Sequence, residues 1–170
     1  IKFIFFRINL NNYYIIFVNY FKIKRIKGNI IMNSQIVDKF FESISAADVD
    51  TAMSYLHDDC VSHDMGTGQV MKGIEQNRAD MENWTSTFSD MKVESMNQVE
   101  SGNTVVTEMK MTGVNTGDME MPDGSKLPAT GKSIELRGCQ ITEFEDGKMI
   151  KTTQYYNMMS MMAQLGLMPE

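Results

Sequence analysis

The sequence predicts an α+β fold on three observations. Segments with helical spacing of apolar residues occupy most of residues 34–88. From residue 91 onward, long stretches alternate between apolar and polar residues, as half-buried strands do. Turn signals such as Ser101-Gly102-Asn103, rather than helices, separate these strands. We therefore expect helices first and a meandering antiparallel sheet afterwards.

Three helices are predicted before the sheet. Ser34 is expected to cap the first, whose apolar positions run from Ile36 to Ile44 at helical spacing. Asp48 should cap a short second helix whose apolar residues extend to Leu56. The segment Gly73–Phe88 has the pattern of a third, amphipathic helix.

The strands are predicted from their alternation and from the turns that bound them. A short strand covers residues 60–63, and two longer strands cover residues 91–100 and 104–116. A long loop, 117–131, contains two of the three prolines. A C-terminal hairpin and a short apolar helix complete the chain.

The C-terminal hairpin can take two registers. A two-residue turn would pair Glu145 with Lys148, whereas a three-residue loop with a left-handed Gly147 would pair Phe144 with Lys148. The alternation favours the three-residue loop, because a one-residue slip would mix the apolar and polar faces. One face then contains Ile134, Leu136, Gly138, Gln140, Thr142, Phe144, Ile150, Thr152, Gln154 and Tyr156. We predict that this face lines a binding pocket in which the two glutamines converge.

Charge is divided unevenly along the chain of 170 residues. Six of the 16 basic residues lie in residues 1–31, which contain no acidic residue. Residues 32–170 therefore hold the other 10 basic residues and all 22 acidic ones, a net charge of −12. Nucleic-acid binding requires clustered Lys and Arg, so we expect no nucleic-acid partner.

Residues 1–31 also differ in composition from the remainder. They contain neither Ala, Asp, Glu, Ser nor Thr, and consist mostly of residues that AT-rich codons specify. The first methionine, Met32, directly precedes the first predicted helix. We predict a non-native or disordered extension over 1–31 and one domain over 32–170; a membrane-associating or structured segment is the alternative. The apolar run Ile15–Val18 is short, and a spanning helix needs about 20 mostly apolar residues, so no stable membrane insertion is expected.

Cysteines and histidines give no sign of a metal site or a disulfide framework. Cys60 and Cys139 fall on separate predicted strands, which favours free thiols and a reducing, cytoplasmic compartment. His57 and His63 have no cysteine or carboxylate cluster at ligand spacing. We therefore expect no metal.

Five motifs occur in order along the predicted domain: H-D-M-G-T-G-Q-V-M-K-G-I-E at 63–75, G-V-N-T-G at 113–117, P-A-T-G-K at 128–132, E-F-E-D-G-K at 143–148 and Q-L-G-L-M-P-E at 164–170. Together they resemble the SnoaL-like polyketide cyclases, often labelled ester cyclases, of the nuclear transport factor 2-like superfamily. The resemblance implies a cone-shaped, curved antiparallel sheet wrapped around three N-terminal helices, with an apolar pocket and pairing into a homodimer. It also implies ring closure of a small hydrophobic or polyketide-like molecule by an intramolecular aldol reaction, with an aspartate as acid/base and no cofactor.

The final strand departs from the family pattern. The family motif E-H-W-D-Y-Y-D corresponds to K-T-T-Q-Y-Y-N at 151–157, which places Gln154 at the acid position and Gln140 opposite it one strand back. An amide can donate to a developing oxyanion, but it cannot take up and return a proton at neutral pH. Two hypotheses follow: a cofactor-independent cyclase or isomerase, and a noncatalytic module that binds a small hydrophobic ligand.

His63 is the remaining candidate for acid/base work, because an imidazole exchanges protons near neutral pH. The alternative for His63 and Asp64 is a loop-anchoring hydrogen bond. All 17 methionines lie in 32–170. Two interpretations are open: they line an adaptable pocket, or they replace leucine in the core. The predicted catalytic residues are His63, Gln140 and Gln154, and the predicted substrate-binding residues are Asp64, Trp84, Met109, Met111, Asn115 and Tyr156.

Overall fold

The structure, a computed structural model, describes residues 32–121 and 124–168, so the extension predicted over residues 1–31 lies outside the described residues. The elements are α1 (Asn33–Ser45), α2 (Val49–Met53), β1 (Leu56–Asp64), β2 (Val70–Lys72), α3 (Gly73–Thr87), β3 (Phe88–Ser101), β4 (Thr104–Asn115), β5 (Met119–Glu120), β6 (Lys126–Leu127), β7 (Ser133–Glu145), β8 (Lys148–Tyr156) and α4 (Met158–Leu165). The predicted α+β class is confirmed. Of the helices described, none is long and apolar enough to cross a membrane.

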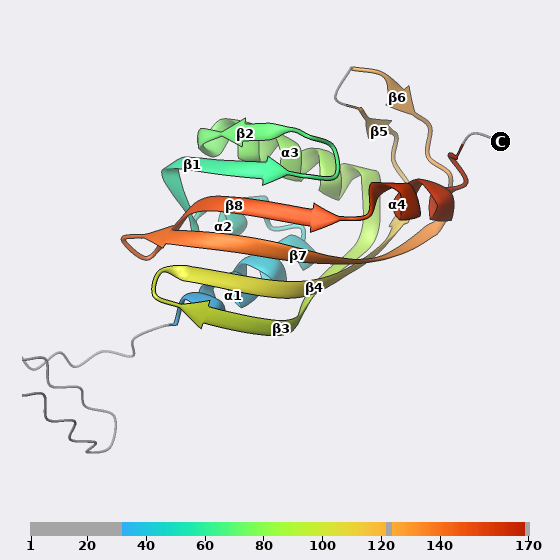
Figure 1. Cartoon of the computed structure of the whole chain (residues 1–170). Helices are drawn as coiled ribbons and strands as arrows, with labels where there is room; N and C mark the ends of the chain where they lie inside the picture. Colours follow the sequence, from blue (N-terminus) through green and yellow to red (C-terminus); the bar gives the residue numbers. More distant parts are fainter. Residues whose placement is uncertain (1–31, 122–123, 169–170) are drawn as a thin grey trace, which may run out of the picture. The chain divides into compact units, whose positions relative to one another are not determined.

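The main sheet has six strands in the order β2-β1-β8-β7-β4-β3, and it curves around the helices (Figure 1). Pairing is antiparallel except between β1 and β8, which run parallel. The expectation of a wholly antiparallel sheet was therefore wrong at one position. Helix α3 takes the chain from β2 at one edge of the sheet to β3 at the other edge, and the meander β3-β4-β7-β8 then places the last strand beside β1. The predicted loop 117–131 contains a small separate sheet, β5-β6.

The first helix is capped by a distant residue and not by its own serine. The backbone N–H groups of Asn33 and Ser34 donate to the Glu100 carboxylate at 3.2 and 3.0 Å, and the Ser34 hydroxyl donates to it at 2.7 Å. Met32 occupies the N-cap position. The prediction that Ser34 caps the helix was wrong because a carboxylate from β3 satisfies the free N–H groups of the first turn.

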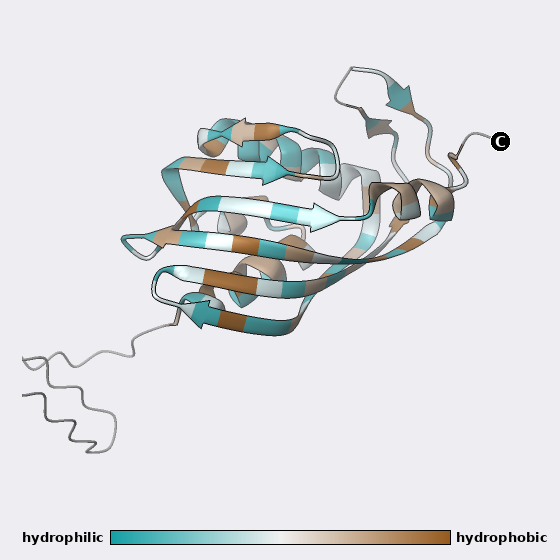
Figure 2. Cartoon of the chain, viewed as in Figure 1, coloured by the Kyte–Doolittle hydropathy of each residue, from teal (hydrophilic) through white to brown (hydrophobic). Residues whose placement is uncertain are grey.

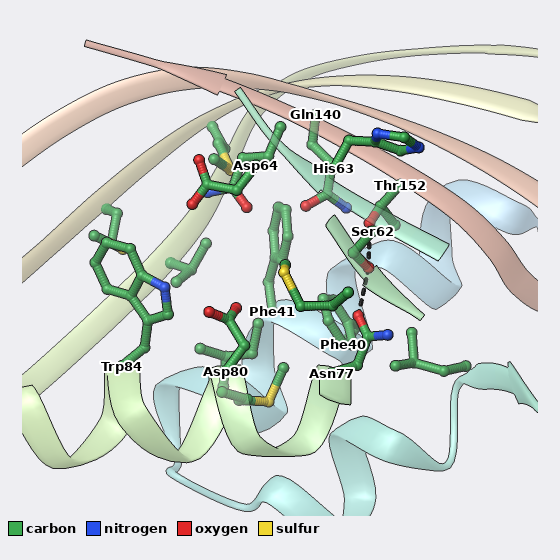
Figure 3. A pocket seen from close by; sticks show the side chains of 18 of the residues that line it. Phe40, Phe41, Ser62, His63, Asp64, Asn77, Asp80, Trp84, Gln140 and Thr152 are labelled. Atoms are coloured by element: carbon green, nitrogen blue, oxygen red, sulfur yellow. Dashed lines mark hydrogen bonds between the residues drawn. The ribbon is translucent and has the colours of Figure 1, made fainter. Parts of the chain in front are cut away.

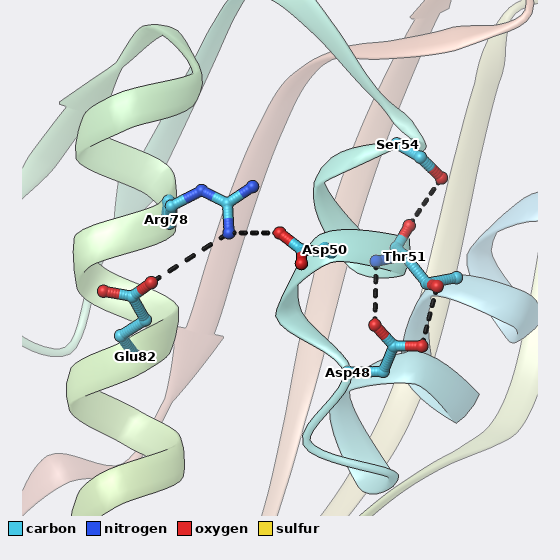
Figure 4. A network of polar contacts seen from close by, with 6 residues as sticks. All are labelled: Asp48, Asp50, Thr51, Ser54, Arg78 and Glu82. Carbon is cyan, nitrogen blue, oxygen red and sulfur yellow. Dashed lines mark hydrogen bonds and ion pairs between the residues drawn. The ribbon is translucent and has the colours of Figure 1, made fainter.

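The second helix begins as its sequence predicts. Asp48 accepts hydrogen bonds from the backbone N–H and the hydroxyl of Thr51, at 3.0 and 2.7 Å, and these bonds lower the pKa of Asp48 (Figure 4). Asp50 pairs with Arg78 of α3 at 2.7 Å, which links α2 to α3. The helix ends at Met53, and Leu56 is the first residue of β1.

The C-terminal hairpin has the two-residue turn, so the predicted three-residue loop was wrong. Glu145 pairs with Lys148, and both turn residues have positive φ, 48° and 76°, as a type I′ turn requires. The register then shifts, because Phe144 pairs with Met149 while Glu143 pairs with Lys151. This bulge restores the alternation that the turn alone would have lost. Gln140 therefore pairs directly with Gln154, on the face that was predicted.

Apolar side chains of the sheet and helices form two adjoining clusters on the inner side of the sheet. Brown and teal alternate along β3, β4 and β7 in Figure 2, as expected for strands with one buried face. The buried methionines are Met53, Met91, Met109, Met111, Met119, Met149 and Met161. Methionine thus fills much of this core.

Candidate functional site

A cavity of about 100 Å³ lies between the inner face of the sheet and helices α1 and α3 (Figure 3). Its walls are mostly aromatic, aliphatic and thioether side chains: Phe40, Phe41, Ile44, Leu56, Met71, Met81, Trp84, Met91, Val93, Met109 and Met111. Its polar lining is Ser62, Asp64, Asn77, Asp80, Gln140, Thr152 and Gln154, and His63 borders it. An apolar cavity with a few convergent polar groups is typical of a small-molecule site.

Asp80 enters the cavity from α3. Asn77, Asp80, Met81 and Trp84 are spaced so that they share one helical face, and all four line the cavity. Within the described part of the chain, the Asp80 carboxyl group has no hydrogen-bond or ion-pair partner. Burial, and then the negative charge of Asp64, raise its pKa to about 6. Asp80 can therefore hold or release a proton near neutral pH.

Asp64, the last residue of β1, is fixed by three hydrogen bonds. Its Oδ1 accepts from the backbone N–H groups of Gly66 and Thr67 at 2.7 and 3.0 Å, and its Oδ2 accepts from the Tyr156 hydroxyl at 3.1 Å. Burial, and then the charge of Asp64, raise the pKa of Tyr156 well above its usual value, so the phenol stays protonated and donates. The predicted loop anchor is thus made by Asp64 with the backbone of its own loop.

Gly66 makes the contact between Tyr156 and Asp64 possible. A Cβ atom at position 66 would lie 2.4 Å from Cζ and 2.8 Å from the hydroxyl oxygen of Tyr156. The ring therefore crosses the loop where only a glycine leaves space. Any side chain here would displace the phenol from Asp64.

His63 borders the cavity, but its imidazole ring extends away from the carboxylates of Asp64 and Asp80 (Figure 3). Side chains alternate along β1, so that Ser62 and Asp64 face inward while His63 is in register with Thr153 and Val70. His63 lines the same cavity as Gln140 and Gln154, as predicted, but its ring is not directed at the carboxylates. Its catalytic role loses geometric support.

The two glutamines lie side by side on neighbouring strands. Gln140 is only 4% exposed, and its amide nitrogen donates to the Thr142 hydroxyl at 3.0 Å. The side-chain amide of Gln154 forms no hydrogen bond with another described residue. Both amides line the cavity together with Trp84, Met109 and Met111. Gln154 is thus the amide most available to a ligand.

Asn115 lies outside the cavity, contrary to the prediction that it binds substrate. Its amide nitrogen donates to the carbonyl oxygen of Gly117 at 2.8 Å. Its Oδ1 accepts from the backbone N–H and the hydroxyl of Thr130 at 2.7 and 2.9 Å. Asn115 therefore fixes both ends of the 117–131 segment. It is 1% exposed and is not among the residues that line the main cavity.

A chain of hydroxyl and amide groups closes one side of the cavity. Thr152 donates to Ser62 at 2.8 Å, and Ser62 donates to Asn77 at 2.5 Å (Figure 3). Asn77 in turn donates to the carbonyl oxygen of Gly73 at 2.8 Å. Sequence reasoning missed this chain and Asp80. The available signal was that Asn77 and Asp80 interrupt the apolar stripe of an otherwise amphipathic helix. Among the described residues, no group of three or more His, Cys, Asp and Glu side chains is arranged to hold a metal.

Comparison with solved structures supports the fold. A candidate SnoaL-like polyketide cyclase from Jannaschia sp. CCS1 superposes with a TM-score of 0.70 at 20% identity, covering 85% of this chain and 99% of that one. A candidate polyketide cyclase from Streptomyces antibioticus gives 0.66 at 22% identity, over 80% and 99%. A hypothetical protein from Catenulispora acidiphila with a ketosteroid isomerase-like fold, solved with trimethylamine, gives 0.67 at 17% identity, over 79% and 94%.

Comparison with curated proteins finds no match. A model of the family described as SnoaL-like polyketide cyclase matches residues 35–165. The match spans α1 to α4 and includes every residue that lines the cavity. The chain therefore belongs to the SnoaL-like polyketide cyclase family.

Proposed function

We propose that the protein is a cofactor-independent acid/base enzyme that acts on a polyketide-like ketone, closing a ring by an intramolecular aldol reaction. The observation that carries the proposal is Asp80, a carboxyl group in a mostly apolar cavity that has no partner among the described residues and whose pKa is raised to about 6. The family's acid position holds Gln154, and Asp80 supplies an acid from another element. Its pKa lies close to the range in which proton transfer at neutral pH is efficient.

The chemistry uses one proton that leaves and returns. The Asp80 carboxylate accepts a proton from the carbon beside a ketone carbonyl, and the C–H electron pair forms the enolate. The enolate carbon attacks a second carbonyl of the same molecule, forming a C–C bond and an alkoxide. Asp80 then returns the proton to the alkoxide. The Gln154 amide is suited to donate to the enolate oxygen.

The second hypothesis, a noncatalytic binding module, is favoured by the amide at the family's acid position. It predicts that ketones bind in the cavity without exchange of their α-protons. The two hypotheses therefore differ in a measurement that does not require the natural substrate.

The test is the exchange of α-protons of cyclohexanone in deuterium oxide, followed by NMR. The wild type should accelerate exchange, with a rate that rises with pH through about 6 as Asp80 ionises. Asp80→Asn should lower the protein-dependent rate by at least about 100-fold. Glu75→Gln, a change on the exposed side of the same helix, should leave it unchanged. Equal exchange by wild type and Asp80→Asn would exclude Asp80 as the acid/base, and binding without exchange would support the binding module.

The outer face of the sheet supports a homodimer as the assembly. The registers place Val99, Val106, Ile141 and Thr153 in one row across β3, β4, β7 and β8. Val99 and Val106 are 62% and 38% exposed. Exposed valines on the outer face of a sheet, beside the partly exposed Ile141, fit a symmetric, self-complementary interface. We also infer a reducing, cytoplasmic location, because both cysteines are free thiols.

A further inference from the structure

A second cavity, of about 40 Å³, lies beside the first between α3, β5 and α4. Its most characteristic lining is four methionine side chains, Met119, Met121, Met158 and Met161. Met119 and Met161 are buried, at 8% and 1% exposed. Thioether side chains are apolar and repack easily around ligands. The rest of the lining includes Thr67, Gln69, Asn83 and Glu120, so it is the methionine side of this cavity that suits a flexible apolar group.

The two cavities adjoin and share part of their lining. Asp64, Asp80 and Trp84 line both of them. A third space, of about 10 Å³, is bounded by Trp84, Gln154 and Tyr156. The indole of Trp84 stacks on Phe88, with 5.6 Å between ring centroids, and meets Tyr156 edge-on at 6.3 Å. Trp84 therefore forms the shared wall of all three spaces.

The main cavity is small for the ligand that the family match suggests. Its volume of about 100 Å³ falls below the roughly 300–1,000 Å³ that is usual for ligand pockets. A ligand of polyketide size must therefore occupy more than this cavity. The methionine-lined cavity is an adjoining space that shares Asp80 with the main cavity.

We propose that the methionine-lined cavity binds an apolar chain of the substrate while the ring-forming part occupies the main cavity. The substrate class is then a ketone with an alkyl or polyene chain, and Asp80 meets it at the junction between the two parts. The role of Asp80 in this proposal rests on the proposed function. The chain-binding site itself rests on the residues that line both cavities.

The test is the binding of 2-alkylcyclohexanones with chains of zero to eight carbons, measured by the fluorescence of Trp84, the single tryptophan of the chain. Affinity in the wild type should rise about fourfold with each of the first added methylenes, the ratio that corresponds to about 0.8 kcal/mol per buried CH₂ group. The rise should end when the cavity is full.

The decisive variant is Met158→Phe, which narrows the methionine-lined cavity. It should flatten the dependence on chain length and leave the affinity for cyclohexanone unchanged. Met159→Phe is the matched control, because Met159 is the next residue of the same helix and is 61% exposed; it should keep the wild-type dependence. Equal chain-length dependence in wild type and Met158→Phe, or none in the wild type, would overturn the proposal.

Failure of the two proposals can be distinguished because one is measured by binding and the other by proton exchange. If affinity does not depend on chain length while Asp80-dependent exchange is intact, only the proposed chain-binding site is refuted. If affinity depends on chain length but exchange does not depend on Asp80, only the proposed catalytic role of Asp80 is refuted, and the protein is a module that binds chain-bearing ketones.

Discussion

Replacing Asp80 with asparagine should stabilise the fold at neutral pH, because it removes a carboxylate that the apolar cavity disfavours. Asparagine has nearly the same volume and no charge, so the packing against Met81 and Trp84 is preserved. In the folded protein the pKa of Asp80 is raised from 3.8 to about 6. The folded state therefore binds the proton more tightly than the unfolded state between these two values, and wild-type stability falls as pH rises through this window.

The magnitude follows from the shift. Each pKa unit corresponds to 1.36 kcal/mol, so ionised Asp80 costs about 3 kcal/mol at pH 7 and roughly half a kcal/mol at pH 4. The free energy of unfolding of Asp80→Asn, relative to that of the wild type, should rise by about this difference between pH 4 and pH 7. Such a gain at the expense of activity is expected where a catalytic group is held in an unfavourable environment.

The measurement is urea denaturation of wild type, Asp80→Asn and the surface control Glu75→Gln at pH 4, 5, 6 and 7. The stability difference between Asp80→Asn and wild type should grow with pH and level off above about 6. The control should show no comparable growth. A difference that does not change with pH, or an asparagine variant less stable than wild type at pH 7, would refute the burial argument.

Three further changes test other parts of the structure. Gly66→Ala should displace the Tyr156 ring, which lies 2.4 Å from a Cβ built at position 66, and destabilise the fold by about 1–3 kcal/mol; an unchanged thermal midpoint would contradict this close approach. Glu100→Gln should weaken the cap of α1 by about 1 kcal/mol, seen as a lower urea midpoint, because the amide NH₂ cannot accept from the N–H groups that the carboxylate binds. Val106→Asp should shift a homodimer to monomers in sedimentation by placing a charge in the exposed apolar row; a wild type that already sediments as a monomer would rule out the dimer.

The sequence by itself determined the features that depend on local pattern. Helical spacing in residues 34–88 and alternation after residue 91 predicted the element order, and Asp48 predicted its own helix start. The inward face of the C-terminal hairpin was also correct except at the bulge, where Met149 and not Ile150 is buried opposite Phe144, although the predicted loop was wrong. The alternation of side chains constrains which face is buried more strongly than it constrains the turn, since a bulge can reconcile the same faces with either turn.

Only the tertiary structure decided which polar groups meet. Glu100 reaches Ser34 across 66 positions of sequence, so no local motif could show that the carboxylate replaces the serine as the cap. In the sequence, Asp80 is one polar residue on an amphipathic helix. In the fold, Asp64 of β1 lies near it and the apolar walls of the cavity reduce its contact with solvent. Its raised pKa is a property of that enclosure. His63 borders the cavity with its ring directed away from the carboxylates, because strand register, and not residue type, decides which side of a sheet a side chain faces.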